Sequence, residues 1–195
     1  MYYSLKTLGG KMNQNKRLVC PMAIAGLLDS KFRRLFHNPN KILKPFINKN
    51  MTVLDIGCGP GVFSIEIAKL LEGTGKVISV DMQEGMLEII RNKIIGKSIE
   101  KNIVLHKCTQ ESINIREKVD FVLMFYMVHE VPSKERLFDE VLPLINKNGL
   151  IMIVEPGLIS SNEFNEMVNY IRDKRFEEYK ILKIMFSKGI VLRKL

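Results

Sequence analysis

The sequence contains no hydrophobic run close to the roughly 20 residues that a helix needs to cross a bilayer. Its longest apolar runs, near 121–128 and 150–154, are the length of strands. The first residues, MYYSLKTLGGKMNQNKR, lack the apolar stretch of a secretory signal peptide. We therefore expect a cytoplasmic protein, and 195 residues are enough for one domain with a sizeable core.

Cysteine is also scarce. Cys20, Cys58 and Cys108 lie far apart in the sequence, and no CxxC pair or His-rich cluster accompanies them. Neither a zinc site nor a disulfide framework is indicated, and we predict no metal site. An arsenic-binding set of thiols would require these three cysteines to converge, and the sequence does not indicate that they do.

Acidic residues are almost missing from the first quarter of the chain. Residues 1–50 hold ten Lys or Arg and one acid, Asp29, so their formal charge of +9 equals that of the whole protein. A basic arm beside a neutral body favours an anionic substrate, a phospholipid surface or nucleic acid as partner. The alternative is a solvated face that aids solubility.

The same region contains an amphipathic segment, residues 21–36, whose apolar stripe is formed by Ile24, Leu27, Leu28, Phe32 and Leu35. We predict that residues 1–45 form a basic arm and helix that cover a ligand site in a second unit, residues 46–195. The helix is expected either to dock on the body, to act as a lid, or to touch anionic lipid at a membrane surface.

From residue 51 onward, strand and helix patterns alternate. Strands are predicted over 51–57, 76–81, 102–108, 119–126 and 149–155, and helices over 62–73, 84–95, 133–145 and 161–176. Pro143 is expected to kink the third of these helices. The segments YKILKIMF and GIVLRKL follow as two strands, joined at SKG. The pattern predicts an α/β fold: a Rossmann-like, doubly wound sheet of seven mostly parallel strands, with an antiparallel C-terminal pair and a helical N-terminal cover.

The segment VLDIGCGPGVF (53–63) places three alternating glycines directly after a predicted strand. Gly57, Gly59 and Gly61 allow the backbone to approach a ligand closely. In an open parallel sheet, ligands bind beyond the carboxyl ends of the strands. The dinucleotide fingerprint G-x-G-x-x-G fails, because Val62 stands where its third glycine would fall.

The pattern that is present is D-x-G-x-G-x-G, which begins at Asp55. It resembles motif I of the class I S-adenosylmethionine-dependent methyltransferases. The resemblance implies that the backbone of Gly57, Cys58, Gly59 and Gly61 lies under the methionyl part of S-adenosylmethionine, with Asp55 near its ammonium group.

A second element supports this resemblance. Asp81 ends the second predicted strand, 20 residues after Gly61, and a carboxylate there can accept hydrogen bonds from both ribose hydroxyls. The family likeness then places Met82 against the adenine and Phe125 close to the cofactor.

The segment after the third strand departs from the family pattern. Many members carry a Gly-Asp pair whose Asp receives the adenine amino group, but this chain has HKCTQES, with Thr109 at that position. We expect Thr109, Gln110 or Glu111 to make the contact.

Candidate acceptor residues follow the fourth and fifth strands. The resemblance and the strand ends predict Tyr126, His129 and Glu155 as substrate-binding residues, and His129 as a general base near neutral pH. His129 can instead be a hydrogen-bonded loop anchor. Glu155 ends an apolar strand, where a lone carboxylate needs a partner, whereas Glu130 is expected to face solvent or pair with a base.

Phrases such as GLLD, VLDIGCGPG, FYMVHEV and EP are similar to small methyltransferases related to the ubiquinone and menaquinone biosynthesis type. The likeness implies magnesium-independent, in-line methyl transfer to a small-molecule acceptor. Two alternatives stay open. The basic arm fits an RNA or DNA methyltransferase, although the Asn/Asp-Pro-Pro-aromatic motif that grips an extruded base is missing after the fourth strand. The second alternative is that the protein is a non-catalytic module that binds the cofactor.

Overall fold

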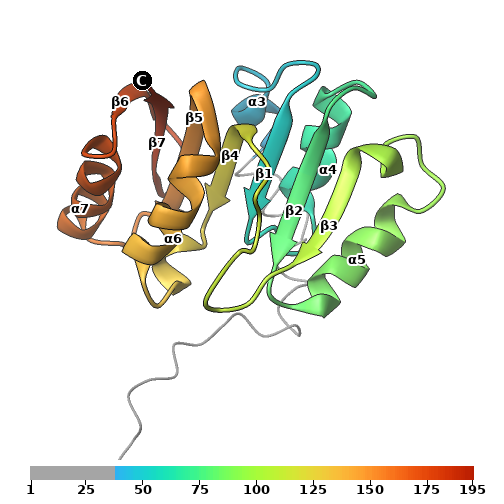
Figure 1. Cartoon of the computed structure of the whole chain (residues 1–195), viewed down its shortest axis with the longest axis horizontal. Helices are drawn as coiled ribbons and strands as arrows, with labels where there is room; N and C mark the ends of the chain where they lie inside the picture. Colours follow the sequence, from blue (N-terminus) through green and yellow to red (C-terminus); the bar gives the residue numbers. More distant parts are fainter. Residues whose placement is uncertain (1–37) are drawn as a thin grey trace, which may run out of the picture.

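The computed structural model describes residues 38–195, so the helix predicted over 21–36 lies outside the described residues. The described residues form one seven-stranded sheet with the order β3-β2-β1-β4-β5-β7-β6 (Figure 1). The strands are β1 Thr52–Ile56, β2 Lys76–Asp81, β3 Ile103–Lys107, β4 Val119–Phe125, β5 Ile145–Pro156, β6 Phe176–Leu182 and β7 Ser187–Lys194. Strands β1 to β5 are parallel, and β7 runs antiparallel to β5 and β6. The predicted fold class is confirmed.

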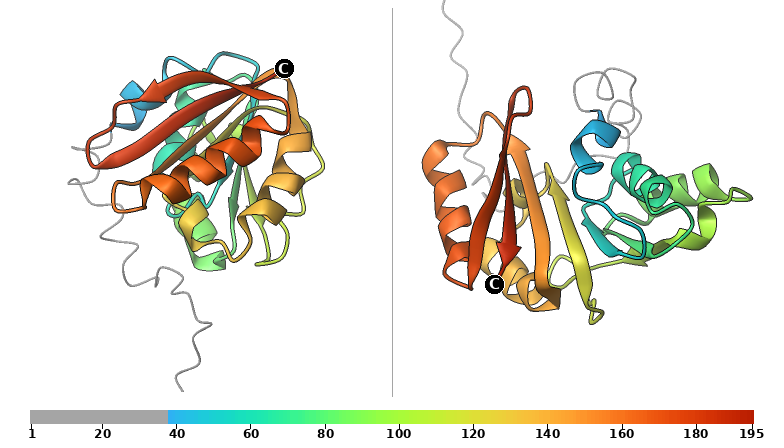
Figure 2. Two further views of the ribbon diagram at one scale, coloured as in Figure 1. Left: turned by 90° about the vertical axis from the view of Figure 1, so that its left-hand side faces the viewer. Right: turned by 90° about the horizontal axis from the view of Figure 1, so that it is seen from above.

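Helices cover both faces of the sheet (Figure 2). One face carries α3 Pro39–Leu43, α4 Val62–Leu70 and α5 Glu84–Ile94, and the other carries α6 Lys134–Val141 and α7 Ser161–Arg172. Within residues 38–195 the chain also forms three 3₁₀ turns, η1 Glu100–Asn102, η2 Val128–Glu130 and η3 Leu142–Leu144. Among residues 38–195, none of the helices has the length and apolar character needed to cross a membrane.

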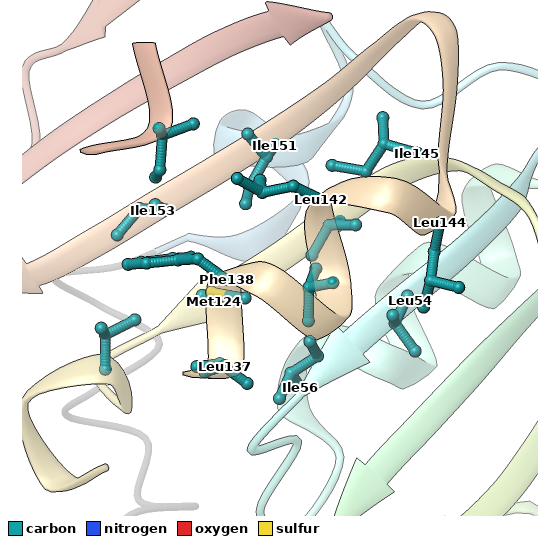
Figure 3. Close-up of a cluster of buried hydrophobic side chains, with 14 of the residues drawn as sticks. Leu54, Ile56, Met124, Leu137, Phe138, Leu142, Leu144, Ile145, Ile151 and Ile153 are labelled. Carbon is teal, nitrogen blue, oxygen red and sulfur yellow. The ribbon is translucent and has the colours of Figure 1, made fainter. Parts of the chain in front are cut away.

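Two hydrophobic cores result from the alternation of side chains along each strand. Leu54 and Ile56 point into the core beneath α6 and α7, which Figure 3 shows with Met124 and Phe138. Val53 points into the opposite core, beneath α4 and α5. The neighbours of β1 are β2 on one side and β4 on the other. The connections from β1 and from β3 therefore lead to opposite sides of β1, which makes its carboxyl end the switch point of the strand order. Open α/β sheets bind their ligands at such a switch point, beyond the carboxyl ends of the strands.

The segment before β1 is part of the body. Leu43, Phe46 and Ile47 are buried in the core that α4 and α5 cover. The side-chain amide of Asn40 in α3 donates to Glu66 of α4 over 2.7 Å. Any cover formed by residues before 38 is therefore attached to a helix that already packs on the sheet.

The helix predicted over 133–145 is shorter than expected. Ser133 caps α6 by accepting a hydrogen bond from the Arg136 backbone N–H, and the α-helix ends at Val141. Pro143 then lies in the 3₁₀ turn η3. The prediction of a kink was wrong because a proline has no N–H for the helical ladder and here ends the α-helix instead.

The helix predicted over 161–176 and the strand that follows are also displaced. The α-helix ends at Arg172, and the backbone of Arg175 is left-handed, with φ +69°. Strand β6 then begins at Phe176, whose buried side chain joins the core on the α7 face. The sequence pattern extended the predicted helix to Phe176 because this apolar residue fits the helical spacing, but Phe176 belongs to the strand.

The turn predicted at SKG was wrong. Ser187 already begins β7, and Gly189 pairs with Leu182 inside the hairpin. A Cβ added to Gly189 would lie 3.0 Å from the Leu182 Cβ atom. This glycine therefore marks a close approach between strands, not a turn. The hairpin loop comes earlier, over 183–186.

Candidate active site

The loop between β1 and α4 lies at the switch point, and its glycines all have left-handed backbone: φ is +67° at Gly57, +51° at Gly59 and +82° at Gly61. A Cβ on Gly57 would lie 2.8 Å from the Met127 Cβ atom. A Cβ on Gly61 would lie 2.6 Å from Ile90 Cγ1. At Gly59 it would meet no described atom within 4 Å. The outer glycines serve packing, whereas Gly59 leaves its backbone open to a ligand.

Asp81 connects this loop to the end of β2. Its Oδ2 atom accepts a hydrogen bond from the Gly59 N–H over 2.9 Å, and its Oδ1 atom accepts one from the Gln83 N–H over 2.9 Å. Burial raises the pKa of Asp81, and these backbone hydrogen bonds oppose that shift. Each carboxylate oxygen can accept a second hydrogen bond, so Asp81 can still receive two ligand hydroxyls.

Asp55 lies beneath the same loop and is almost completely buried. Burial raises its pKa to about 7, although Ser64 Oγ donates a hydrogen bond to its Oδ2 atom over 2.5 Å. The nearby charge of Asp81 adds to the shift. A buried carboxyl group with a raised pKa beside a cavity is unfavourable for folding and typical of functional sites.

A cavity of about 500 Å³ opens over these groups, a volume that suits a small-molecule ligand. It is lined by all but one of the predicted cofactor residues, namely Asp55, Gly57, Cys58, Gly59, Asp81, Met82, Thr109, Gln110 and Phe125, and by the predicted acceptor residues Tyr126 and His129. Gly61 lies outside this lining, against Ile90, and Glu155 lies behind His129. The fold therefore gathers residues from four strand ends into one site.

The charges of the lining favour a cation. Among the described residues that line the cavity, five are acidic: Asp55, Asp81, Glu111, Glu130 and Glu140. Arg136 is the one Lys or Arg among them. Such a cavity suits a ligand that carries positive sulfonium and ammonium groups.

The loop after β3 is fixed by its own hydrogen bonds. Thr109 Oγ1 accepts from the N–H groups of Glu111 and Ser112, over 3.2 Å each. Both lone pairs of this hydroxyl are thereby used, and only its proton remains for a ligand. Gln110 is exposed beside it and lines the cavity. An amino group, which donates, is thus better received by Gln110 than by the Thr109 hydroxyl.

The aromatic wall of the cavity lies around the end of β4 and includes Phe63 of α4. The ring of Phe125 lies 4.3 Å from that of Phe63 and 4.7 Å from that of Tyr126, centroid to centroid. Tyr126 has left-handed backbone, with φ +57°, and its Oη atom lies 2.5 Å from Ser187 Oγ. An aromatic residue whose backbone is in the left-handed region is strained, and such strain concentrates at functional sites.

His129 and Glu155 form a hydrogen-bonded pair at the edge of the cavity. Nδ1 of His129 lies 2.6 Å from Glu155 Oε2, and the buried carboxylate also accepts from the N–H groups of Val128 and His129. The hydrogen bond to Glu155 raises the pKa of His129. Because a carboxylate only accepts, Nδ1 carries a proton, and Nε2, which lies 3.9 Å from Glu130 Oε1, is the nitrogen that can meet a ligand. Glu155, predicted to line the acceptor site, orients His129 from behind.

The thiols do not form a reactive set in the described residues. Cys58 and Cys108 both line the cavity, but burial raises the pKa of Cys58 well above its usual value and that of Cys108 to about 11. A thiol with a raised pKa is a poor nucleophile and metal ligand near neutral pH. Cys20 lies outside the described residues.

Several residues of the site were missed from the sequence, and three of them bear on its charge and hydrogen bonding. Ser64 bonds Asp55 from inside α4, and Arg136 lines the cavity from α6. Glu140 holds the loop after β3 by accepting from Ser112 Oγ over 2.7 Å. Their helical positions resemble ordinary helix surface. The capping serine before α6 was the available signal, because it starts that helix beside the loop that carries His129.

The comparisons with known proteins agree with this geometry. A doubly wound sheet with a glycine loop and a carboxylate at the end of β2 defines a nucleoside-binding α/β domain. Residues 47–186 match the family described as a methyltransferase domain, and the chain belongs to that family. Membership confirms the predicted class, the S-adenosylmethionine-dependent methyltransferases.

Individual relatives are more distant. The chain is 26% identical over 104 residues to the demethylmenaquinone methyltransferase of Oceanobacillus iheyensis. This match covers 53% of this chain and 44% of that protein. The chain is 27% identical over 146 residues to a Saccharolobus solfataricus protein named "probable cobalt-precorrin-6B C(15)-methyltransferase (decarboxylating)", covering 74% of this chain and 70% of that one. This chain thus spans less than half the length of the Oceanobacillus relative.

Solved structures confirm the fold. A SAM-dependent methyltransferase from Aquifex aeolicus superimposes with a TM-score of 0.78 at 22% identity. The match covers 89% of this chain and 98% of the Aquifex chain.

Proposed function

We propose that this protein transfers the methyl group of S-adenosylmethionine to a small-molecule acceptor. The observation that carries the proposal is one cavity whose lining contains the open backbone at Gly59, the carboxylate of Asp81 and the imidazole of His129. The names of the relatives support it, since demethylmenaquinone and precorrin methyltransferases act on small molecules.

The described residues fit the cofactor part by part. Asp81 has the free lone pairs to receive the ribose hydroxyls, and the backbone at Gly59 is open to the methionyl part. Asp55 offers a carboxylate to the ammonium group. Met82 is 39% exposed at the cavity and can lie against the adenine, whose amino group Gln110 receives. When bound, S-adenosylmethionine supplies an electrophilic methyl group and a neutral thioether leaving group.

The acceptor lies on the other side of the cavity, against the wall formed by Phe125 and Tyr126. Nε2 of His129 takes the proton that an O–H or N–H acceptor releases when it is methylated. Glu155 holds the ring and stabilises the imidazolium that results. The apolar walls and the size of the cavity favour an acceptor with an aromatic or aliphatic body.

Turnover with a panel of quinol, phenol, thiol and amine acceptors, read as formation of S-adenosylhomocysteine, tests this proposal. The proposal is supported if one class of acceptor yields product and if His129→Gln abolishes this turnover while it still binds the cofactor. Cofactor binding without product from any class favours the non-catalytic alternative.

The nucleic-acid alternative is tested separately. Retention on a nucleic-acid column that falls steeply with salt, together with methylation of RNA or DNA, favours it over a small acceptor. Retention that does not depend on salt removes it.

A further inference from the structure

Two loops lie side by side at the carboxyl edge of the sheet. One follows β5 and contains Gly157 and Leu158, and the other is the β6–β7 hairpin loop, which ends at Phe186. The Gly157 N–H donates to the Phe186 carbonyl over 2.8 Å. A Cβ on Gly157 would lie 2.9 Å from that oxygen, so the contact requires a glycine.

These loops expose three large apolar side chains. Leu158 is 98% exposed, Phe186 75% and Met185 55%. Single exposed apolar residues are ordinary, but three on two loops that are joined by a backbone hydrogen bond are typical of an interaction surface. Phe186 also has left-handed backbone, with φ +56°, which is strained for an aromatic residue. We refer to Leu158, Met185 and Phe186 as the apolar tip.

The apolar tip adjoins the mouth of the cavity. Pro156, just before the first loop, lines the cavity. Ser187, just after the second, is bonded to the hydroxyl of Tyr126, which also lines it. A surface that binds the tip therefore faces the route into the site.

The two loops that carry the apolar tip are themselves positively charged. The segments 156–161 and 183–188 contain two lysines, Lys183 and Lys188, and no acidic residue. Lys183 is exposed, and Lys188 contacts the carbonyl of Ile159. The nearest acids along the chain are engaged: Glu155 holds His129, and Glu163 pairs with Lys134. Apolar side chains flanked by lysines match the interface of an anionic bilayer.

We propose that the apolar tip docks on anionic lipid membranes, with Leu158, Met185 and Phe186 inserted at the interface and the cavity mouth turned toward the lipid. This surface acts independently of the proposed methyl transfer, because binding to lipid needs neither cofactor nor turnover. Its function would be to admit acceptors that partition into the membrane.

The test uses the absence of tryptophan from the chain. Phe186→Trp in the full-length protein gives a single fluorophore at the tip, and Ile95→Trp gives one at a residue that is 67% exposed after α5. With vesicles of phosphatidylcholine containing about a third phosphatidylglycerol, emission of the first variant shifts to the blue and that of the second does not. Pure phosphatidylcholine vesicles give a much smaller shift.

Sedimentation with the same vesicles gives the second measurement. Leu158→Ser combined with Phe186→Ser lowers the partition coefficient about tenfold or more, because two inserted apolar side chains are lost. Ile95→Ser leaves it unchanged. Both variants replace exposed side chains, so thermal unfolding should match the wild type.

Several results overturn the proposal. An unshifted emission from the tip on anionic vesicles does so, even if the protein sediments with them through its basic N-terminal residues. So does blue-shifted emission without vesicles: if it depends on protein concentration, a second copy covers the tip, and otherwise another segment of the same chain does.

Discussion

Nδ1 of His129 lies 2.6 Å from Oε2 of Glu155, and this contact joins the loop after β4 to the end of β5. The carboxylate is 2% exposed and also accepts the backbone N–H groups of Val128 and His129. The orientation of the imidazole is thus set by a group that does not itself reach the cavity. Its consequences for rate, pH dependence and stability can be measured.

The first prediction concerns Glu155→Gln and the pH profile of turnover. The hydrogen bond to Glu155 raises the pKa of His129 above its ordinary value of 6.5. Because only the neutral imidazole accepts a proton, the wild-type rate rises with pH through that raised pKa. In Glu155→Gln the midpoint moves down toward 6.5 and the plateau rate falls, while the Kd for S-adenosylmethionine stays the same.

His129→Gln is the matched variant for that profile. Loss of a general base lowers kcat by about 10²–10⁴-fold and removes the midpoint. A His129→Gln enzyme with wild-type kcat and the same profile would assign the histidine a purely structural role. Stability gives an independent check: since folding raises the pKa of His129, its stabilising contribution is full below pH 6.5 and is lost as pH rises through the raised pKa.

The second prediction concerns Asp55→Asn and stability. The pKa of Asp55 is raised from 3.8 to about 7, so the folded state binds a proton that the unfolded state releases. Wild-type stability therefore decreases as pH rises from about 4 to about 7. Asparagine does not titrate, and we expect Asp55→Asn to be more stable than wild type near pH 8, by up to about 4 kcal/mol.

Thermal unfolding across this pH range measures the difference. The gain should shrink toward zero near pH 4, where both side chains are neutral. An Asp55→Asn variant that is destabilised equally at all pH values would show that the buried carboxyl group is not strained. Binding of S-adenosylmethionine should weaken in the same variant, since we propose that Asp55 receives the ammonium group of the cofactor.

The third prediction separates two glycines of one loop. Gly59→Ala places a methyl group where no described atom lies within 4 Å, so the cost to folding is that of left-handed backbone, about 1–2 kcal/mol. Cofactor binding falls sharply, because the methyl group fills the space above the backbone. Gly61→Ala instead strikes Ile90 at 2.6 Å and should cost more stability. Equal effects of both variants on binding and on Tm would contradict this division.

The fourth prediction concerns the proposed cover. Deletion of residues 1–18 leaves α3 and the buried Leu43 in place. If the N-terminal residues cover the acceptor, the deletion raises the KM for the acceptor and leaves the Kd for S-adenosylmethionine nearly unchanged. Equal loss of both would make these residues part of the fold instead.

The proposed cofactor half of the site could be located from the sequence because its features are local. A strand, a glycine loop and a carboxylate at the next strand end have fixed spacings, and parallel strands bring those ends together. The structure accordingly places Gly59 and Asp81 in contact, over 2.9 Å. Alternation of strands and helices likewise predicted the doubly wound sheet.

The proposed acceptor half was less predictable because it depends on contacts between distant segments. Nothing near Glu155 in the sequence indicates that its carboxylate lies behind His129, and the competition for the lone pairs of Thr109 appears only in the folded loop. Gly189 was taken for a turn residue because a sequence does not show which strand packs against it.

The most direct measurement is calorimetric titration of S-adenosylmethionine into wild type, Asp81→Ala and Asp120→Ala. Asp120 is the matched control: its carboxylate also accepts two N–H groups, from Thr52 and Asn146, but at the opposite edge of the sheet. We predict one binding site in wild type, an affinity at least about tenfold weaker in Asp81→Ala, and no change in Asp120→Ala. No binding to wild type, or undiminished binding to a folded Asp81→Ala, would contradict the assignment of this cavity as the cofactor site.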